Sequence, residues 1–414
     1  MNAWIAWSLL NLFCIFQFML QGSIGVMAQS MRIDLDLDAA AISLISSSFY
    51  VSYVLMQIPV GLIYDRVGIR KTVFYSSFLV ALTCLAMAFV KTLFAAIVVR
   101  VFMGIGCAFS FVGLLAGARQ WFEVKKFTSL MMVGESLSMA GLFVLNLILS
   151  ILISKSSWQN SMLVFGVLGL LMSASLHFYI KETPQQRSSS VARLNLKELF
   201  LQIIVDMRNI ITDLRIWLCG LIGGASFALI TIFIAMWAIP FFRRAYNLDN
   251  IEATSLASLV YLGVALGCPV MAFLVRKFQI LMIMMCCSVA CAILVSFIIY
   301  LPSLPLSLLK ALLLFLGFFL ASYQLPFALV GGFVDKRLQS SAIGFTNMVN
   351  MSFAPIFQPV IGLVLSASSG GVFDNYEKYD ILAYKKALLF IPFTQLLAVL
   401  LALLLYLKLR RSSN

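Results

Sequence analysis

The chain has 414 residues, of which 62% are hydrophobic and only 11% are Asp, Glu, Lys or Arg, and its formal net charge is +13. A soluble domain carries about 25% charged residues and could not bury so much apolar surface, so this composition excludes a water-soluble fold. The positive charge does not indicate nucleic-acid binding, because most Lys and Arg residues lie in short segments between apolar runs, where they orient a membrane protein.

Apolar runs long enough to cross a lipid bilayer, about 20 residues each, recur along the chain and predict an all-α integral membrane protein. We predict twelve transmembrane helices, over residues 4–28, 41–64, 72–90, 93–118, 128–152, 160–180, 214–240, 252–275, 279–300, 306–331, 341–367 and 387–407. The first run lacks a preceding basic region and is too long for a signal peptide, so we expect a retained span. An even number of spans places both termini on one side.

The distribution of cations predicts which side that is. With the N-terminus inside, 19 of the 29 Lys and Arg residues lie in inner segments and nine in outer ones. The remaining cation, Arg100, lies within a span. Segments 34–38 and 374–380, on the outer side, are acidic. The bias of about two to one predicts that the N- and C-termini are cytoplasmic.

Residues 181–213 separate the first six spans from the last six. This segment opens with Pro, Gln and Ser residues, which are typical of a linker, and continues with apolar residues at helical spacing. It predicts either a helix on the membrane surface or the approach to span seven. We therefore expect an N-terminal six-helix bundle (1–180), a cytoplasmic linker with an amphipathic helix (181–213) and a C-terminal six-helix bundle (214–414).

The stretch GLIYDRVGIRK between spans two and three concentrates charges in a short loop. Its glycines, Gly61 and Gly68, permit a tight turn and close backbone approach. Its acid, Asp65, is placed to meet the N-terminus of a neighbouring helix. Its cations are Arg66, Arg70 and Lys71. These could instead be ordinary inner-loop charges. A second stretch, IVVRVFMGIGCAF at 97–109, places Arg100 and two glycines within span four.

The loop resembles the signature G-x-L-x-D-R-x-G-R-K of the major facilitator superfamily, from which Ile69 is a minor departure, and the second stretch resembles that family's fourth-span motif. The resemblance covers the whole chain. It implies a bacterial transporter of twelve helices in two bundles, a monomer in the inner membrane. It also implies a conformational latch made of Gly61, Asp65, Arg66, Gly68, Arg70 and Lys71. The latch would close on span eleven near Ser340 and Ser341 when the protein faces outward.

Two charged residues lie inside predicted spans, where charge is costly and usually functional. Arg100 is a fixed positive charge suited to an anion or a carboxylate. Glu135, on span five, is the candidate proton carrier. Their depths differ by about 10 Å at 1.5 Å per residue, so a direct pair, a shared cavity or a water bridge are all open. Glu135 could also be a structural residue that turns towards the cytoplasm.

Polar residues on the spans outline a candidate substrate path. Beyond the two charges, the substrate and coupling candidates are Gln17, Gln21, Tyr53, Gln57, Trp237, Tyr323, Gln324, Asn347 and Gln358. The amides and tyrosines at Asn11, Tyr50, Tyr261 and Asn350 belong to the same set, although some of these residues will serve helix packing. Pro326 and Pro359 lie beside two of the glutamines and predict interrupted helical hydrogen bonding there, a frequent feature of midplane sites.

These features predict a secondary active transporter that works by alternating access, with proton symport through Glu135. Its substrate would be an amino acid, a short peptide or an organic acid, because Arg100 favours a carboxylate. The alternatives are an uncoupled facilitator or exporter, and a non-transporting receptor or assembly factor. We expect no enzyme, metal or cofactor, because no nucleophile, metal cluster or phosphate-binding loop is evident. Span five also lacks the Gly-Pro motif typical of drug antiporters.

Overall fold

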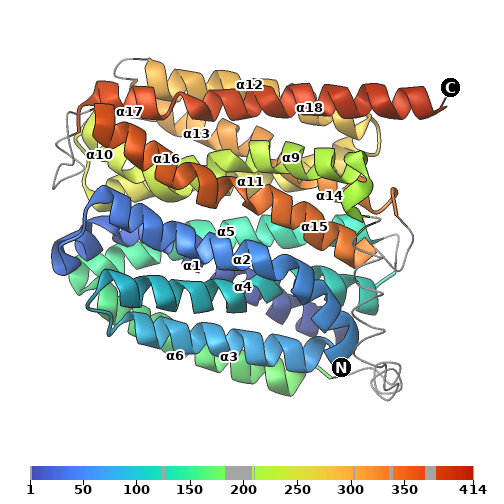
Figure 1. Ribbon diagram of the computed structural model, residues 1–414, viewed down its shortest axis with the longest axis horizontal. Helices are drawn as coiled ribbons and strands as arrows, with labels where there is room; N and C mark the ends of the chain where they lie inside the picture. The colour runs from blue at the N-terminus through green and yellow to red at the C-terminus, as the bar shows by residue number, and fades with distance from the viewer. Residues whose placement is uncertain are drawn as a thin grey trace.

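The computed structural model describes residues 2–123, 126–181, 208, 210–301, 304–334, 339–368 and 379–413. Within these residues the regular structure is helical, and 12 helical segments are long and apolar enough to cross a membrane (Figure 1). The all-α fold and the number of spans are confirmed. Most of the predicted amphipathic helix of the linker falls in residues 182–207 and 209, outside the described ranges.

Each of the first six spans is one continuous helix. Their bounds are α1 Ala3–Leu35, α2 Ala39–Val67, α3 Ile69–Met87, α4 Leu93–Trp121, α5 Phe127–Lys155 and α6 Trp158–Tyr179. The first helix runs seven residues beyond its predicted end. It continues past the apolar run through Arg32 and Asp34. Gly68 separates α2 from α3 with φ of 84°, a backbone conformation that glycine adopts at low cost.

Four of the last six spans are segmented. Span seven comprises α9 Leu214–Ala228, the π-helical η2 Leu229–Trp237 and α10 Ala238–Tyr246, and spans eight and nine are α11 Asn250–Leu274 and α12 Ile280–Tyr300. Span ten comprises α13 Leu306–Leu320, the 3₁₀ turn η3 Ala321–Gln324 and α14 Leu325–Val330. Span eleven comprises α15 Gln339–Met351 and α16 Phe353–Ser368, and span twelve comprises α17 Ile381–Ala387 and α18 Phe390–Ser413. The last span begins six residues earlier than predicted, because α17 includes Lys385 and Lys386.

The two sets of six spans have the same pattern of helix neighbours. In the first set α2 packs on α4, α3 on α6 and α1 on α5. In the second set α11 packs on α13, α12 on α18 and α9 on α15, which are the same pairs six spans later. This repetition is what a duplicated six-helix unit would produce.

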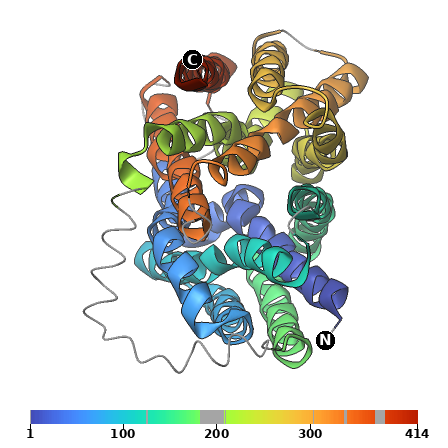
Figure 2. The same ribbon diagram turned by 90° about the vertical axis from the view of Figure 1, so that its right-hand side faces the viewer.

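The two sets meet along two seams. One seam joins α5 to α11, and the other joins α2 to α15 and α16. Figure 1 shows the spans lying side by side, with both chain ends at the same end of the bundle, and Figure 2 looks onto that end. We call it the terminal end, and the other the opposite end.

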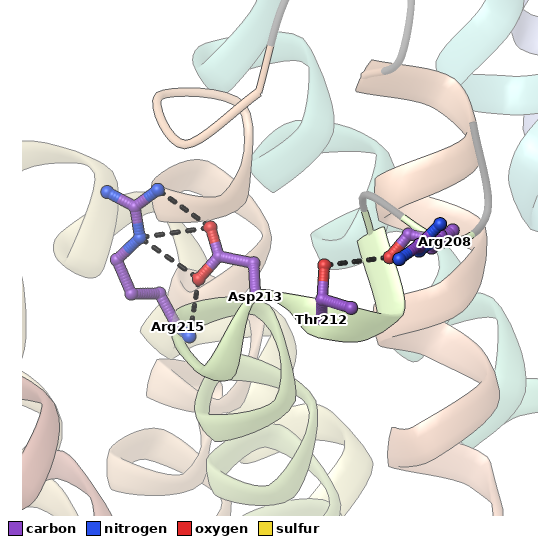
Figure 3. Close-up of polar contacts among 4 residues, drawn as sticks. All are labelled: Arg208, Thr212, Asp213 and Arg215. Carbon is purple, nitrogen blue, oxygen red and sulfur yellow. Dashed lines mark hydrogen bonds and ion pairs between the residues drawn. The ribbon is translucent and has the colours of Figure 1, made fainter. Parts of the chain in front are cut away.

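Span seven starts at a charged cap. Asp213 precedes α9, and its carboxylate accepts hydrogen bonds from the Arg215 backbone N–H (2.8 Å) and from the Arg215 guanidinium (2.7 Å to Nη2), as Figure 3 shows. Partial burial raises the pKa of Asp213, but the hydrogen bonds from Arg215 and the charges of Arg215 and Lys408 outweigh it, so that the pKa lies below its usual range. The ionised carboxylate therefore satisfies orphan amide donors at the start of the helix.

Glycines allow α11 and α13 to pack with their backbones in contact. A Cβ added at Gly317 would collide with the carbonyl oxygen of Val260 and lie 3.0 Å from the Cα of Gly263. Close approach of this kind is how helices associate in lipid, where no hydrophobic force drives them together.

We expect Gly317→Ala to destabilise the protein, because the added methyl group forces α11 and α13 apart at a cost of about 1–3 kcal/mol. Gly332→Ala is the control, because its Cβ would meet only Leu329 O at 3.4 Å. Thermal unfolding in detergent should show a lower midpoint for Gly317→Ala alone. Equal midpoints for the two variants would contradict this account of the packing.

Candidate functional site

A small cavity lies between the two halves near the middle of the spans. Its volume is about 10 Å³, which is room for roughly one water molecule. The lining residues are Phe18, Tyr53, Phe111, Tyr323, Gln324, Phe327, Asn347, Asn350 and Met351. The cavity therefore draws residues from both halves, and five of them, Tyr53, Tyr323, Gln324, Asn347 and Asn350, were candidates from the sequence.

Glu135 on α5 is joined to the other half at this cavity. The hydroxyl of Tyr323, in the 3₁₀ turn of span ten, donates a hydrogen bond to Glu135 Oε1. Gln324 Nε2 donates in turn to the Tyr323 hydroxyl (3.0 Å), and the ring of Phe227 stacks on Tyr323 at 4.3 Å between centroids. Glu135 is 2% exposed. The carboxyl group is thus held by a phenol and an amide, and no described cation lies within 4 Å of it.

A second polar contact crosses between the halves at the same depth. Asn347 Nδ2 on α15 donates to Gln57 Oε1 on α2 at 2.9 Å, and Gln57 Nε2 reaches Ala108 O at 3.5 Å. Tyr53 lines the cavity one helical turn before Gln57. Asn350 also lines it, and neither its amide nitrogen nor its amide oxygen has a hydrogen-bond partner. An unpartnered buried amide is costly, so Asn350 is a group that a bound molecule could satisfy.

Arg100 lies nearer the opposite end and is 1% exposed. Its Nη1 donates to Leu20 O at 2.8 Å, and its guanidinium lies 4.6 Å from the ring centroid of Phe49. Its Nε and Nη2 have no partner, and no described carboxylate lies within 4 Å. A buried, uncompensated guanidinium with two free donors is arranged to receive an anion.

Other polar groups gather around Arg100. Tyr50 is fully buried, lies beside Gln21, Arg100 and Gln358, and its hydroxyl has no hydrogen-bond partner. Gln358 donates from Nε2 to Thr231 O (2.6 Å) and leaves its Oε1 unpartnered. Both halves contribute to this second cluster, since α2 and α4 belong to the first and α16 to the second.

The other candidates connect or flank these two clusters. Gln17 donates to Gln21 at 2.6 Å and accepts from Ser110 at 3.1 Å. These polar side chains of α1 therefore lie between the two clusters. Trp237, the last residue of η2, is buried and lies near Gly362 of α16. Asn11 is a packing residue, because its amide donates to Gly134 O and Ser138 within the first half.

Two sequence-based expectations receive a clear answer. Arg100 and Glu135 do not pair directly, because they lie in separate clusters and bind different partners. Span ten is broken beside Gln324, as predicted. Span eleven is not broken at Pro359, which lies inside α16; its break is at Ser352, whose backbone N–H bonds both Met348 O and Val349 O.

The halves touch at both ends of the bundle. At the opposite end Gly25 of α1 abuts the carbonyl group of Ala235 in η2, and Asn250 donates to Val26 O at 3.5 Å. Towards the terminal end, an added Cβ at Gly344 would lie 2.9 Å from Gln57 O. With contacts at both ends and a cavity of about 10 Å³, this conformation encloses the centre of the protein.

The latch remains a prediction. The side chains of Asp65, Arg66 and Ser340 lie outside what the structure describes. Arg70 binds within the first half, because its Nε donates to the His177 carbonyl at 3.1 Å on α6. Lys71 is exposed, and Gly61 is buried beside Tyr64.

Sequence reasoning missed several residues of the seam. Ser136, next to Glu135, donates across the halves to Ala265 O at 2.6 Å. Phe49 and Phe227 support Arg100 and Tyr323, respectively. Asn146 lies beside Tyr261, with its Oδ1 unpartnered. Of these residues, only Ser136 had a signal in the sequence, because it lies next to the intramembrane acid Glu135. The two phenylalanines had none, since phenylalanines are common throughout the spans.

The twelve spans, the two repeated sets and the buried polar centre define a polytopic membrane protein built from two six-span sets. The sequence profile described as the Major Facilitator Superfamily matches residues 9–359. The chain belongs to this superfamily. In the part of the chain that the structure describes, no group of three His, Cys, Asp or Glu residues is placed to hold a metal.

Curated relatives are transporters with low sequence identity. The chain is 20% identical over 289 residues to the uncharacterized transporter YybO of Bacillus subtilis, covering 66% of each chain. It is 23% identical over 260 residues to a probable L-galactonate transporter of Escherichia coli, covering 61% of this chain and 57% of that one. It is 23% identical over 172 residues to the hexuronate transporter of B. subtilis, covering 42% and 41%. The chain thus spans less than two thirds of these relatives' length.

A solved structure shows the same fold. The bacterial homologue of the lysosomal transporter Spinster, in an inward-facing and occupied conformation, superposes with a TM-score of 0.73 at 16% identity, covering 98% of this chain and 96% of that one. The prediction of the family and of the fold is confirmed.

We expect Gly25→Ala to disfavour the enclosed conformation, because its methyl group would occupy the space of the Ala235 carbonyl. Gly22→Ala, one turn earlier, is the control, since its Cβ would make ordinary contacts at 3.8 and 3.9 Å. Spin labels at Asp36 and Asn247, in loops at the opposite end, would report their separation. Gly25→Ala should widen the distance distribution; an unchanged distribution would count against this contact as a closing surface.

Proposed function

We propose that the protein is a secondary active transporter that carries a small hydroxylated organic acid, of the sugar-acid type, together with a proton. Each bundle would rock about the enclosed polar centre to open it to one side and then to the other. The relatives whose printed names include a substrate, L-galactonate or hexuronate, support this class of solute.

The observation that carries the proposal is the set of buried polar atoms without partners. Those in the two central clusters include Arg100 Nε and Nη2, Tyr50 Oη, Gln324 Oε1, Gln358 Oε1, and Asn350 Nδ2 and Oδ1. In a membrane each such group costs free energy until something bonds it. A carboxylate would bind the fork of Arg100, and neighbouring hydroxyl groups can donate to and accept from amides. A sugar acid supplies both kinds of group, which an unsubstituted fatty acid does not.

The conformation described here would be an intermediate of the transport cycle. Its cavity of about 10 Å³ is far smaller than the roughly 300–1,000 Å³ typical of ligand pockets, so substrate entry requires the halves to separate. Opening at either end must break a cross-half contact: Gly25 with Ala235 at one end, or Gln57 with Asn347 towards the other.

Glu135 is suited to carry the coupled proton. Its partners, a phenol and an amide, can each accept or donate, so both forms of the carboxyl group can be bonded. The unpartnered Gln324 Oε1 is an acceptor for a carboxylic O–H group. The hydrogen bond from Tyr323 to Glu135 joins the two halves. Protonation of Glu135 and the rocking of the bundles would therefore both change this contact.

The remaining assignments follow the charge pattern. The terminal end is proposed to be cytoplasmic, by the excess of Lys and Arg in its loops, in the inner membrane of a bacterium. We also propose that the two six-span sets are separate bundles joined by the linker, and that the protein is a monomer. An uncoupled facilitator, or an exporter, of the same solutes is the second candidate; a non-transporting receptor would not need the cross-half polar contacts.

We expect Arg100→Gln to reduce uptake of labelled galactonate into proteoliposomes about tenfold or more, because a charge-assisted hydrogen bond contributes about 1.5–3 kcal/mol. Arg100→Lys should recover part of it, since Lys keeps the charge and loses the fork. Lys91→Gln, an exposed cation on a loop, is the control. Galactose, which lacks the carboxylate, should not compete. Competition by galactose, or full activity of Arg100→Gln, would exclude an acid substrate bound at Arg100.

We expect Glu135→Gln to abolish acidification of the vesicle lumen driven by external galactonate, while galactonate exchange persists, because Gln cannot release a proton. A pH-sensitive dye inside the vesicles and labelled solute would follow both fluxes. Asn11→Ala is the control at the contact of α1 with α5 inside the first half, since Asn11 serves packing. If labelled galactonate enters without proton movement in the wild type, the protein is a facilitator and Glu135 is structural.

A further inference from the structure

A groove unrelated to the central site opens at the terminal end of the second half. It has a volume of about 520 Å³ and lies between the start of α12, α14 and the end of α18. Its lining residues are Gln279, Ile280, Leu281, Leu329, Tyr406, Leu409 and Arg410. The walls are therefore mainly apolar, with polar groups only from Gln279, Tyr406 and Arg410.

The groove is continuous with the lipid-facing surface. α12 and α18 pack against each other at the edge of the second half, away from both seams. Large apolar side chains beside the groove are exposed, including Phe278 (59%), Met282 (52%) and Leu407 (43%). In a membrane protein such a surface contacts acyl chains, so a lipid can enter the groove sideways.

The rim of the groove is cationic and uncompensated. Arg410 lines it, Arg411 follows on α18, and Arg276 and Lys277 lie in the turn before α12. All four are exposed, and no described carboxylate lies within 4 Å of them. Gln279 precedes α12 and makes no side-chain cap, so the first backbone amides of that helix have no capping side chain from it.

We propose that this groove binds one anionic phospholipid. The phosphate would lie against Arg410 and Gln279, and an acyl chain would lie along Leu281, Leu329 and Tyr406. Charge complementarity selects an anionic headgroup over a zwitterionic one, because cations near a membrane surface attract anionic lipid. The apolar walls of the groove favour a lipid over a soluble phosphate. A lipid covers the walls with an acyl chain, whereas a soluble phosphate would leave the walls exposed.

A bound lipid at this position would touch the helix that follows the Glu135 contact. Leu329 belongs to α14, the short helix that begins directly after Tyr323 and Gln324. The lipid would hold α14 against α12 and α18, and through it the 3₁₀ turn. This consequence rests on the proposed function, whereas the binding itself does not.

Binding can be measured by native mass spectrometry of the full-length protein in neutral detergent. Titration with phosphatidylglycerol should give a retained 1:1 complex at lower lipid concentration than phosphatidylcholine with the same acyl chains. Arg410→Gln should weaken phosphatidylglycerol binding about fivefold, the effect of one cation near a lipid surface. Lys408→Gln is the matched control on the same helix, because Lys408 lies towards Asp213 and not in the groove.

A second variant tests the apolar part. Leu329→Trp would fill the groove and should reduce binding of both lipids, with thermal unfolding in detergent confirming that it folds. Equal binding of the two lipids, or wild-type binding by Arg410→Gln, would overturn the proposal. Displacement of phosphatidylglycerol by an equal concentration of glycerol phosphate would also overturn it, since the occupant would then be a soluble anion. None of these outcomes depends on transport.

Discussion

The hydrogen bond between Tyr323 and Glu135 is the contact on which the arrangement of the centre depends. A carboxyl group in a membrane interior must be bonded, and no cation in the described part of the chain lies within 4 Å of Glu135. Its partner comes from the second half, which requires span ten to turn its Tyr323 inwards through η3. Ser136 adds a bond to Ala265 O on the same seam, so that α5 is held to both α11 and span ten.

The parts of the fold that could be predicted from sequence are those set by local composition. The length of apolar runs determined the number of spans, and charge scarcity singled out Arg100 and Glu135. Their partners could not be predicted, because Tyr323 lies 188 residues from Glu135 and nothing local encodes that proximity. Proline was an ambiguous signal: the helix breaks before Pro326, whereas Pro359 is accommodated within α16. The π-helical η2, Leu229–Trp237, is apolar except for Thr231, and nothing in its sequence predicted the π-helical geometry.

The candidate site was predictable as a set of residues but not as two clusters. A side-chain amide in a membrane span forms a hydrogen bond with any carbonyl group within reach. The residue then serves helix packing, whereas an amide without such a partner can bind substrate. Asn11 and Gln395 show the packing outcome, since Gln395 bonds Ala225 O and Ser226 O within the second half. Asn350 shows the other outcome, because it is buried and has nothing to bond. Composition cannot separate these cases; the positions of neighbouring backbone carbonyls do.

The irregular segments are unevenly divided between the halves. In the described residues the spans of the first half are continuous helices, whereas η2, η3 and the break at Ser352 all belong to the second. These three irregular segments adjoin cross-half contacts: η2 meets α1, η3 meets Glu135, and Asn347 precedes the break in span eleven. A helix with interrupted bonding deforms at lower cost than a continuous one. Rocking of the halves would therefore be absorbed mainly by the second half, while the first half keeps Arg100 and Glu135 in a constant relation. In the proposed function, an anion site and a proton site fixed on one rigid body would let the other body alone determine which side each of them faces.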